Sequence, residues 1–246
     1  LSRGVGGGRV QDLPGSPKRP DSLYPPGSIA AGEMDIPTQA EVCIIGAGAA
    51  GGIMAWELAR RGIRVVVLES GPHHDFARRF EYMRRFLKGQ NPWRTPLTGL
   101  DLYTTGGGVP YRLEENRVRG VGGSTLYWEG YTYRFHADDF RLRSLYGIAE
   151  DWPISYDDLE PYYVKAEKAL GVAGAGDDPW AARRSATFPL PAFALSYSDR
   201  LFARACKTLG ITLNRLPQAR NSVAYAGRPR CLAYSTCHVC PIGAKA

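Results

Sequence analysis

A run of apolar residues that leads directly into three spaced glycines constrains this fold more than any other feature. The run is Val42–Ile45, and the glycines follow it as Gly46-x-Gly48-x-x-Gly51. A helix-like segment comes next, and a second apolar run ends at Glu69. Strand, glycines, helix, strand and acidic residue therefore occur in the order of a βαβ unit that binds a dinucleotide.

Each part of this pattern has a physical role in such a site. Gly46 permits the tight turn from strand to helix, and Gly48 lets backbone N–H groups approach a pyrophosphate. Gly51 allows the helix to lie close to the strand, with its positive N-terminal end toward the phosphates. Glu69, about 20 residues further on, can accept hydrogen bonds from a ribose. A glycine-rich turn without a ligand is the alternative interpretation.

The bulk composition narrows the class of protein. The chain has 246 residues, 44% of them hydrophobic, and no apolar run approaches the roughly 20 residues of a membrane-spanning helix. The formal net charge is +7, yet no recognised nucleic-acid motif accompanies the basic residues. We therefore expect a soluble α/β protein that does not bind nucleic acid. Its basic residues are interpreted as a solvated face near an anionic cofactor, or as a face that meets an acidic partner.

The patterning also predicts the other elements. Residues 1–38 are dense in Gly and Pro and predict a flexible or irregular arm. The βαβ unit is expected as strand 41–46, helix 50–61 and buried strand 64–69. The remaining expectations are a long loop at 89–116, a linker at 171–191, a strand at 211–216, and helices at 75–88, 137–147, 155–170 and 198–209.

Two expectations concern the core. Phe76, Phe80, Met83 and Leu87 recur at helical spacing and are expected to pack inside the protein. Cys43 and Cys206 are expected to be small buried hydrophobic residues.

A second glycine-rich segment lies far from the first. It is Gly120-Val-Gly122-Gly123-Ser124-Thr125, which a helix would not tolerate, so we expect an exposed backbone there. With the Ser124 and Thr125 hydroxyl groups beside it, the segment suits a second contact to a phosphate or to the edge of a flavin ring. Taken alone, it predicts an ordinary turn equally well.

Several segments together resemble the glucose–methanol–choline oxidoreductases. They are Gly46 to Glu69, Arg119 to Trp128 and Asp151 to Tyr163. Within that family the resemblance is strongest to the bacterial FAD-dependent sugar and gluconate dehydrogenase large subunits, which also share Gly227–Cys231 and Cys240–Lys245. The resemblance covers about residues 38 to 246.

This resemblance implies a Rossmann-like FAD/NAD(P)-binding domain, incomplete in this chain, with part of a second region. Residues 39–246 would be the N-terminal FAD-binding part, and the C-terminal substrate domain would be absent. FAD would accept hydride at its N5 from a carbinol carbon. The implied cofactor-binding residues are Gly46, Gly48, Ala50, Gly51, Glu69, Arg119, Gly122, Gly123, Ser124, Thr125 and Trp128.

The chain departs from the family at two neighbouring positions. Trp128 stands where the broader family usually has Asn or His. Relatives that link FAD covalently through His do so one position earlier, where this chain has Tyr127. We therefore predict that FAD is bound non-covalently.

A cysteine cluster lies near the C-terminal end. Cys231, Cys237 and Cys240 place three soft ligands within ten residues, which suits an iron–sulfur cluster. Three ligands without an evident fourth suggest a [3Fe-4S] form. In the dehydrogenase large subunits the last two cysteines are one residue further apart. Free thiols or a disulfide, and zinc with His238 as a fourth ligand, are the alternatives.

The chain contains no evident catalytic base. Oxidation of an alcohol requires a group that takes the hydroxyl proton, most often a histidine. The family keeps that histidine in its C-terminal part, and none of the four histidines here matches it. We therefore assign no catalytic residue and expect the base beyond Ala246.

These expectations lead to a function. The resemblance implies an FAD-dependent dehydrogenase of alcohols, sugars or polyols that passes electrons, by way of a cluster if one is bound, to a cytochrome or quinone. An oxidase that uses oxygen is the alternative enzyme. A non-catalytic FAD-binding or electron-transfer fragment is the alternative of another class. A nicotinamide enzyme is disfavoured by the second glycine motif.

Overall fold

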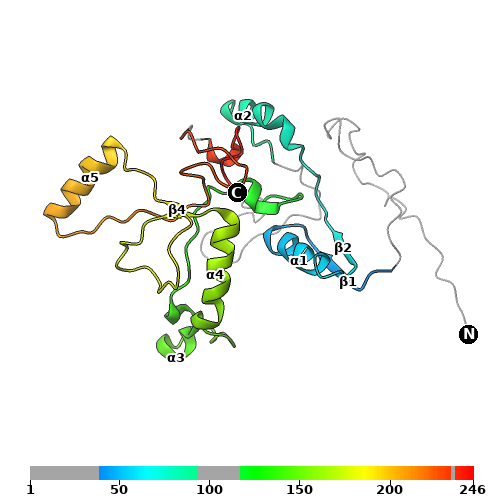
Figure 1. The fold of residues 1–246 in the computed structure, drawn as a ribbon, viewed down its shortest axis with the longest axis horizontal. Helices are drawn as coiled ribbons and strands as arrows, with labels where there is room; N and C mark the ends of the chain where they lie inside the picture. Colours follow the sequence, from blue (N-terminus) through cyan, green and yellow to red (C-terminus); the bar gives the residue numbers. More distant parts are fainter. Residues whose placement is uncertain (1–38, 94–116, 234–235) are drawn as a thin grey trace, which may run out of the picture. The chain divides into compact units, whose positions relative to one another are not determined.

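The fold is that of a computed structural model, which describes residues 39–93, 117–233 and 236–246. The predicted arm at 1–38 and most of the predicted loop at 89–116 lie outside these residues. Figure 1 colours the chain along its sequence. In chain order the described residues form β1 Val42–Ile45, α1 Ala49–Ala59, β2 Val65–Leu68, η1 Phe76–Arg78, α2 Arg79–Leu87, η4 Gly123–Leu126, η5 Ala137–Phe140, α3 Leu142–Tyr146, α4 Tyr156–Leu170, β3 Ala173–Gly174, β4 Leu190–Pro191, α5 Tyr197–Thr208 and η6 Cys237–Val239. The elements written η are short 3-10 helices.

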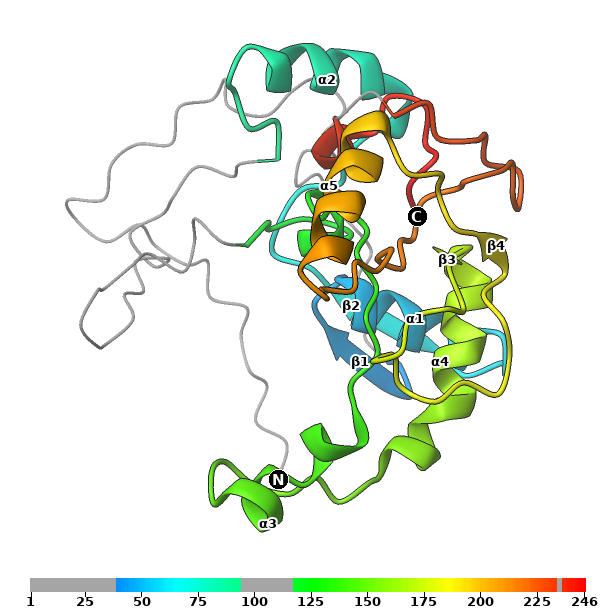
Figure 2. The ribbon, with the colours of Figure 1, turned by 90° about the vertical axis from the view of Figure 1, so that its left-hand side faces the viewer.

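The first three elements form the expected βαβ unit. Strands β1 and β2 are parallel, with Val42 opposite Val65 and Ile45 opposite Leu68. Helix α1 connects them and contacts both (Figures 1 and 2). Parallel neighbours need a crossover connection of this kind. The mixed helix and strand content agrees with the predicted α/β class.

The predictions that the second strand is buried and that Cys43 is buried in the first are wrong. Cys43 is exposed, Ile45 is 88% exposed, and Leu68 is 47% exposed. Parallel sheets are normally covered by helices on both faces, whereas in the described residues the sheet of β1 and β2 has only two strands. The other cysteine prediction is confirmed, because Cys206 is buried.

A small hydrophobic core lies between α2 and η6. Tyr82, Trp93, Leu126 and Val239 are buried together, and α2 contacts η6. The predicted stripe on α2 is largely wrong, since Phe76, Phe80 and Leu87 are exposed and only Met83 packs against the core. The stripe fails because Tyr82, not Phe80, turns toward η6.

Helix α4 begins and ends as its sequence predicts. The Ser155 hydroxyl oxygen accepts from the backbone N–H of Asp158, and the Asp158 carboxylate accepts from the backbone N–H of Ser155. This capping box satisfies N–H groups that a helix leaves unpaired. Gly171 ends the helix in the left-handed region, with φ +70°.

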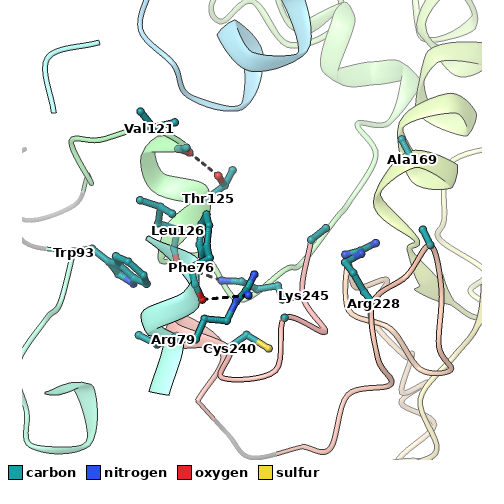
Figure 3. A pocket seen from close by; sticks show the side chains of 15 residues that line it. Phe76, Arg79, Trp93, Val121, Thr125, Leu126, Ala169, Arg228, Cys240 and Lys245 are labelled. Carbon is teal, nitrogen blue, oxygen red and sulfur yellow. Dashed lines mark hydrogen bonds between the residues drawn. The ribbon is translucent and has the colours of Figure 1, made fainter. Parts of the chain in front are cut away.

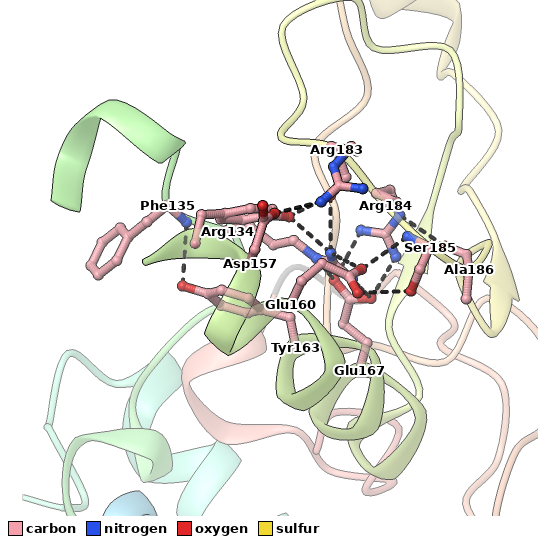
Figure 4. Close-up of polar contacts among 11 residues, drawn as sticks. Arg134, Phe135, Asp157, Glu160, Tyr163, Glu167, Arg183, Arg184, Ser185 and Ala186 are labelled. Carbon is pink, nitrogen blue, oxygen red and sulfur yellow. Dashed lines mark hydrogen bonds and ion pairs between the residues drawn. The ribbon is translucent and has the colours of Figure 1, made fainter. Parts of the chain in front are cut away.

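A buried ion network fastens residues 183–185 to α4 (Figure 4). Arg134 donates to both Glu160 and Glu167, and Arg184 donates to Glu167. The side chains of Arg134 and Glu167 are 5% and 7% exposed. Buried charges persist when they are paired and hydrogen-bonded, and every carboxylate in this network is.

The network changes the acidity of its carboxyl groups. Burial by itself would raise the pKa of Glu167, but hydrogen bonds from Arg134 and Arg184 outweigh it and lower that pKa. The backbone N–H of Ser185, with Arg134, lowers the pKa of Glu160 to about 2. Both glutamates therefore remain charged at neutral pH.

Two further expectations are corrected after α4. The predicted linker at 171–191 contains β3 and β4, which pair in parallel, and Val172 within it is fully buried. The predicted strand at 211–216 is absent, because backbone pairing begins only at Gln218, which forms bridges to Tyr131 and Ala173. The predicted helices at 137–147 and 198–209 correspond to η5 with α3 and to α5. Within the described ranges, no helix combines the length and apolarity needed to cross a bilayer.

Candidate functional site

The first glycine motif forms the turn between β1 and α1. Gly46 has φ +94°, a conformation that favours glycine, and its N–H donates to the Leu68 carbonyl oxygen at 2.7 Å. A Cβ added at Gly51 would lie 2.0 Å from the carbonyl oxygen of Gly46. Helix α1 therefore passes its own entry turn at a distance that only glycine permits.

The start of α1 has room for a ligand. Gly48 is the N-cap, it makes no side-chain cap hydrogen bond, and a Cβ built on it would meet no atom within 4 Å. Ala50 is exposed in the first turn. Unpaired N–H groups at a helix N-terminus attract phosphate, so the residues present fit a pyrophosphate here.

Glu69 braces this turn from the end of β2. One carboxylate oxygen accepts from the backbone N–H of Ala47 and the other from that of Gly71, each at 2.8 Å. Each carboxylate oxygen has a second lone pair, so acceptance from a ribose remains available. The sequence indicated that Glu69 binds a ribose, and did not indicate that Glu69 stabilises the turn.

The second glycine motif docks on the first. The N–H of Gly122 donates to the Ala47 carbonyl oxygen at 2.8 Å, and a Cβ on Gly123 would lie 3.3 Å from the Gly48 Cα. Residues about 75 positions apart are thus in contact. The two motifs form one backbone surface, as their joint assignment to a cofactor requires.

Arg119 lies at the edge of this surface. A Cβ on Gly71 would lie 2.4 Å from the carbonyl carbon of Arg119, and the N–H of Val121 donates to the Pro72 carbonyl oxygen at 3.1 Å. The chain that leaves β2 therefore holds the segment that leads into the second motif.

The polar side chains of the second motif also hold its shape. The Ser124 hydroxyl oxygen accepts from the Val118 N–H at 3.3 Å, and the Thr125 hydroxyl donates to the Gly122 carbonyl oxygen. The backbone N–H of Trp128 donates to the Ser124 carbonyl oxygen at 3.0 Å. The two hydroxyl groups therefore stabilise the conformation of this segment. That they also contact a cofactor stays a prediction.

A cavity of about 570 Å³ opens beside this loop (Figure 3). Gly122, Thr125 and Leu126 form part of its wall. Its other lining residues come from η1, from α2 and the chain after it, from the second glycine motif, from the end of α4 and from the C-terminal segment. They are Phe76, Arg79, Trp93, Val121, Ala169, Ala226, Arg228, Val239, Cys240, Gly243, Lys245 and Ala246.

Lys245 joins the C-terminal segment to the second motif. Its ammonium group donates to the Trp128 carbonyl oxygen at 2.6 Å and to the Leu126 carbonyl oxygen at 3.4 Å. Burial lowers the pKa of Lys245 to about 8. No sequence pattern indicated this contact, which spans 117 positions.

The three cysteines of the cluster lie around one small cavity. Cys231, Cys237 and Cys240 are free and line it together with Arg220 and Lys245. An Arg220 guanidinium nitrogen lies 3.0 Å from the Cys237 sulfur. In the part of the chain that the structure describes, no three His, Cys, Asp or Glu side chains are grouped as ligands of one metal ion. Zinc would require that grouping.

The comparisons with known proteins agree with this site. Residues 41–77, which contain β1, α1 and β2, match the family model described as FAD dependent oxidoreductase. The chain is 35% identical over 224 residues to the fructose dehydrogenase large subunit of Gluconobacter japonicus, a match over 83% of this chain and 41% of that protein. The resemblance to the glucose–methanol–choline oxidoreductases is confirmed.

Two other relatives extend the comparison. The gluconate 2-dehydrogenase flavoprotein of Pantoea cypripedii is 32% identical over 222 residues, which are 75% of this chain and 36% of that protein. The 6'''-hydroxyparomomycin C oxidase of Streptomyces lividus is 33% identical over 216 residues, which are 83% of this chain and 36% of that protein. The chain thus spans about two fifths of the length of the relatives it matches.

Proposed function

We propose that this chain is the FAD-binding part of a dehydrogenase that oxidises CH–OH groups of alcohols, sugars or polyols. The observation that carries the proposal is the contact of Gly123 with Gly48, which makes the two glycine motifs one surface. The names of the relatives support the substrate class, since they include a fructose dehydrogenase and a gluconate dehydrogenase.

Different residues of this surface would bind different parts of FAD. The turn from Gly46 to Gly51 would bind the pyrophosphate at the start of α1, and Glu69 would accept from the adenosine ribose. Gly122 to Trp128 would pack along the flavin. When bound, FAD supplies an acceptor for hydride. The chain contributes orientation and charge around the cofactor, and the proton of the substrate hydroxyl would be taken by a residue of the longer protein.

The first test concerns how FAD is held. The Tyr127 ring is tilted by 44° against the His238 ring, with the centroids 4.1 Å apart. Tyr127 stands where covalent relatives have the histidine that links FAD. We expect the full protein to purify yellow, and acid precipitation to release all of its flavin into the supernatant. Flavin that remained in the pellet would contradict non-covalent binding, and a colourless protein that took up no added FAD would overturn the proposed function.

An oxidase is the second candidate, because one of the relatives is named as an oxidase. The two activities differ in the electron acceptor. With a panel of sugars and polyols, a dehydrogenase should reduce an artificial dye under argon and consume little oxygen in air. Rapid oxygen consumption with hydrogen peroxide formation would favour the oxidase.

We propose in addition that Cys231, Cys237 and Cys240 bind a [3Fe-4S] cluster. The three thiols line one cavity of about 20 Å³, which a cluster would have to widen, and the cations Arg220 and Lys245 beside them would offset the charge of bound thiolates. Electrons would then leave for a cytochrome or quinone. The name of the fructose dehydrogenase relative, a large subunit, supports a partner protein for this step.

Iron and acid-labile sulfide measurements test the cluster. We expect about three irons and four sulfides per chain in protein purified without oxygen, and loss of both when Cys237 is replaced by serine. Cys206→Ser is the matched control, because Cys206 lies on α5 outside the cluster. A full protein that contains FAD without iron would refute the cluster and leave the flavin site intact.

A further inference from the structure

We propose that the cavity beside Gly122 and Thr125 binds an anion, namely the carboxylate or phosphate group of a small molecule. Among the described residues, the cavity wall contains the cationic side chains Arg79, Arg228 and Lys245, and no Asp or Glu side chain. Figure 3 shows the three cations around the same space. In the described ranges, none of the three forms an ion pair with a carboxylate. The proposal rests on these side chains and does not require the proposed role of FAD.

Arg228 carries the strongest sign of a missing partner. One guanidinium nitrogen donates to the Leu170 carbonyl oxygen at 2.6 Å, at the C-terminal end of α4, where a cation is favourable. The other terminal nitrogen, Nη1, is buried and has no hydrogen-bond partner in the described part of the chain. Buried N–H groups are almost always paired. Arg228 also lines the cavity, so its guanidinium would reach an anion there once the buried Nη1 turns toward it.

Arg79 and Lys245 complete the positive wall. The Arg79 guanidinium lies over Gly243, since a Cβ there would be 3.3 Å from the Arg79 Cζ. Within the described ranges, its guanidinium donates one hydrogen bond, to the Phe76 carbonyl oxygen at 3.3 Å. Lys245 uses two of its three N–H donors on carbonyl oxygens, which leaves one donor for a ligand.

The rest of the wall is suited to an uncharged part of the ligand. Trp93, Leu126 and Val239 are buried apolar residues of the core, and all three line the cavity. A volume of about 570 Å³ lies in the range of small-molecule sites. The ligand class is therefore a small organic anion. The anionic group could belong to a separate molecule or to the cofactor itself, since Gly122 and Thr125 line the same cavity.

Calorimetric titration of the full protein with D-gluconate and with inorganic phosphate tests the site, with D-glucose as the neutral control. Arg79→Gln and Arg228→Gln should each weaken binding of the anions about tenfold, the effect of one lost hydrogen bond to a charged group. Arg85→Gln is the matched control, because Arg85 lies on the same helix, is exposed and does not line the cavity. Circular dichroism melting establishes that each variant is folded.

The titrations are done on FAD-free and FAD-loaded protein. Binding in both forms would identify a separate anionic ligand, and binding in the FAD-free form alone would identify the cofactor as the source of the anion. Either result supports the site. Anion affinity that is absent, equal to that for glucose, or lowered equally by Arg85→Gln would overturn it. Flavin fluorescence measures FAD binding separately, so failure of the proposed function is distinguishable.

Discussion

Replacing Gly51 with alanine should destabilise the protein by about 3 kcal/mol and weaken FAD binding about a hundredfold. The added Cβ would lie 2.0 Å from the Gly46 carbonyl oxygen and 3.3 Å from the Ile44 Cγ2. The first of these neighbours is backbone and cannot rotate away, so α1 must lift off the turn. That movement would displace Gly48 from the proposed pyrophosphate. Flavin fluorescence titration and thermal melting measure the two effects.

The next residue of the same helix provides the control. A Cβ at Gly52 would meet no atom within 4 Å, and alanine is favoured over glycine inside a helix by about 1 kcal/mol. Gly52→Ala should therefore raise stability slightly and leave FAD affinity unchanged. If Gly51→Ala bound FAD as well as Gly52→Ala does, the close approach of α1 to its turn would have no functional role.

Replacing Glu167 with glutamine should cost about 3–5 kcal/mol of unfolding free energy. The substitution keeps the shape of the side chain and removes the charge that pairs Arg134 and Arg184. Those two side chains are 5% and 14% exposed, so the buried Arg184 would lose its carboxylate partner and the buried Arg134 would keep Glu160 alone. Urea denaturation of the two proteins gives the difference.

An exposed ion pair and a pH titration test whether the loss of stability comes from the buried charge of Glu167. Glu150→Gln removes an ion pair with Arg143 whose side chains are 77% and 64% exposed, and such pairs contribute little. The pKa of Glu167 is lowered in the folded protein. Its contribution is therefore present above the ordinary value of 4.5 and is lost as pH falls through the lowered pKa. The difference between native protein and Glu167→Gln should shrink over the same acid range. A difference that stayed constant with pH would contradict the charge explanation.

The sequence predicted what local patterns determine. The βαβ unit and the helix at 155–170 depend on local periodicity and on nearby turn and capping residues. These elements were found with bounds that differ by one or two residues. The second glycine motif was also found, although its contact with Gly48 is a long-range feature that spacing alone does not reveal.

The features that the sequence could not predict depend on how elements distant in the chain pack against each other. Periodicity placed Phe80 in the core, but the position of η6 decided which face of α2 is buried, and that face carries Tyr82. Cys43 lies in an apolar strand yet is exposed. The three cations of the cavity come from positions 79, 228 and 245 and make no motif.

The packing of Gly123 on Gly48 limits how such chains can be recombined. Consider a hybrid with the opening βαβ unit of one relative and the remaining chain of another. Its two glycine motifs would come from different proteins and would not be adapted to pack against each other. A shift of less than an ångström in either turn would open a gap or force a collision at the one place where neither side has a side chain to adjust. Exchanging residues 41–77 together with the stretch from 117 to 128 would keep both partners of that contact, and crossover points outside these segments should give folded hybrids most often.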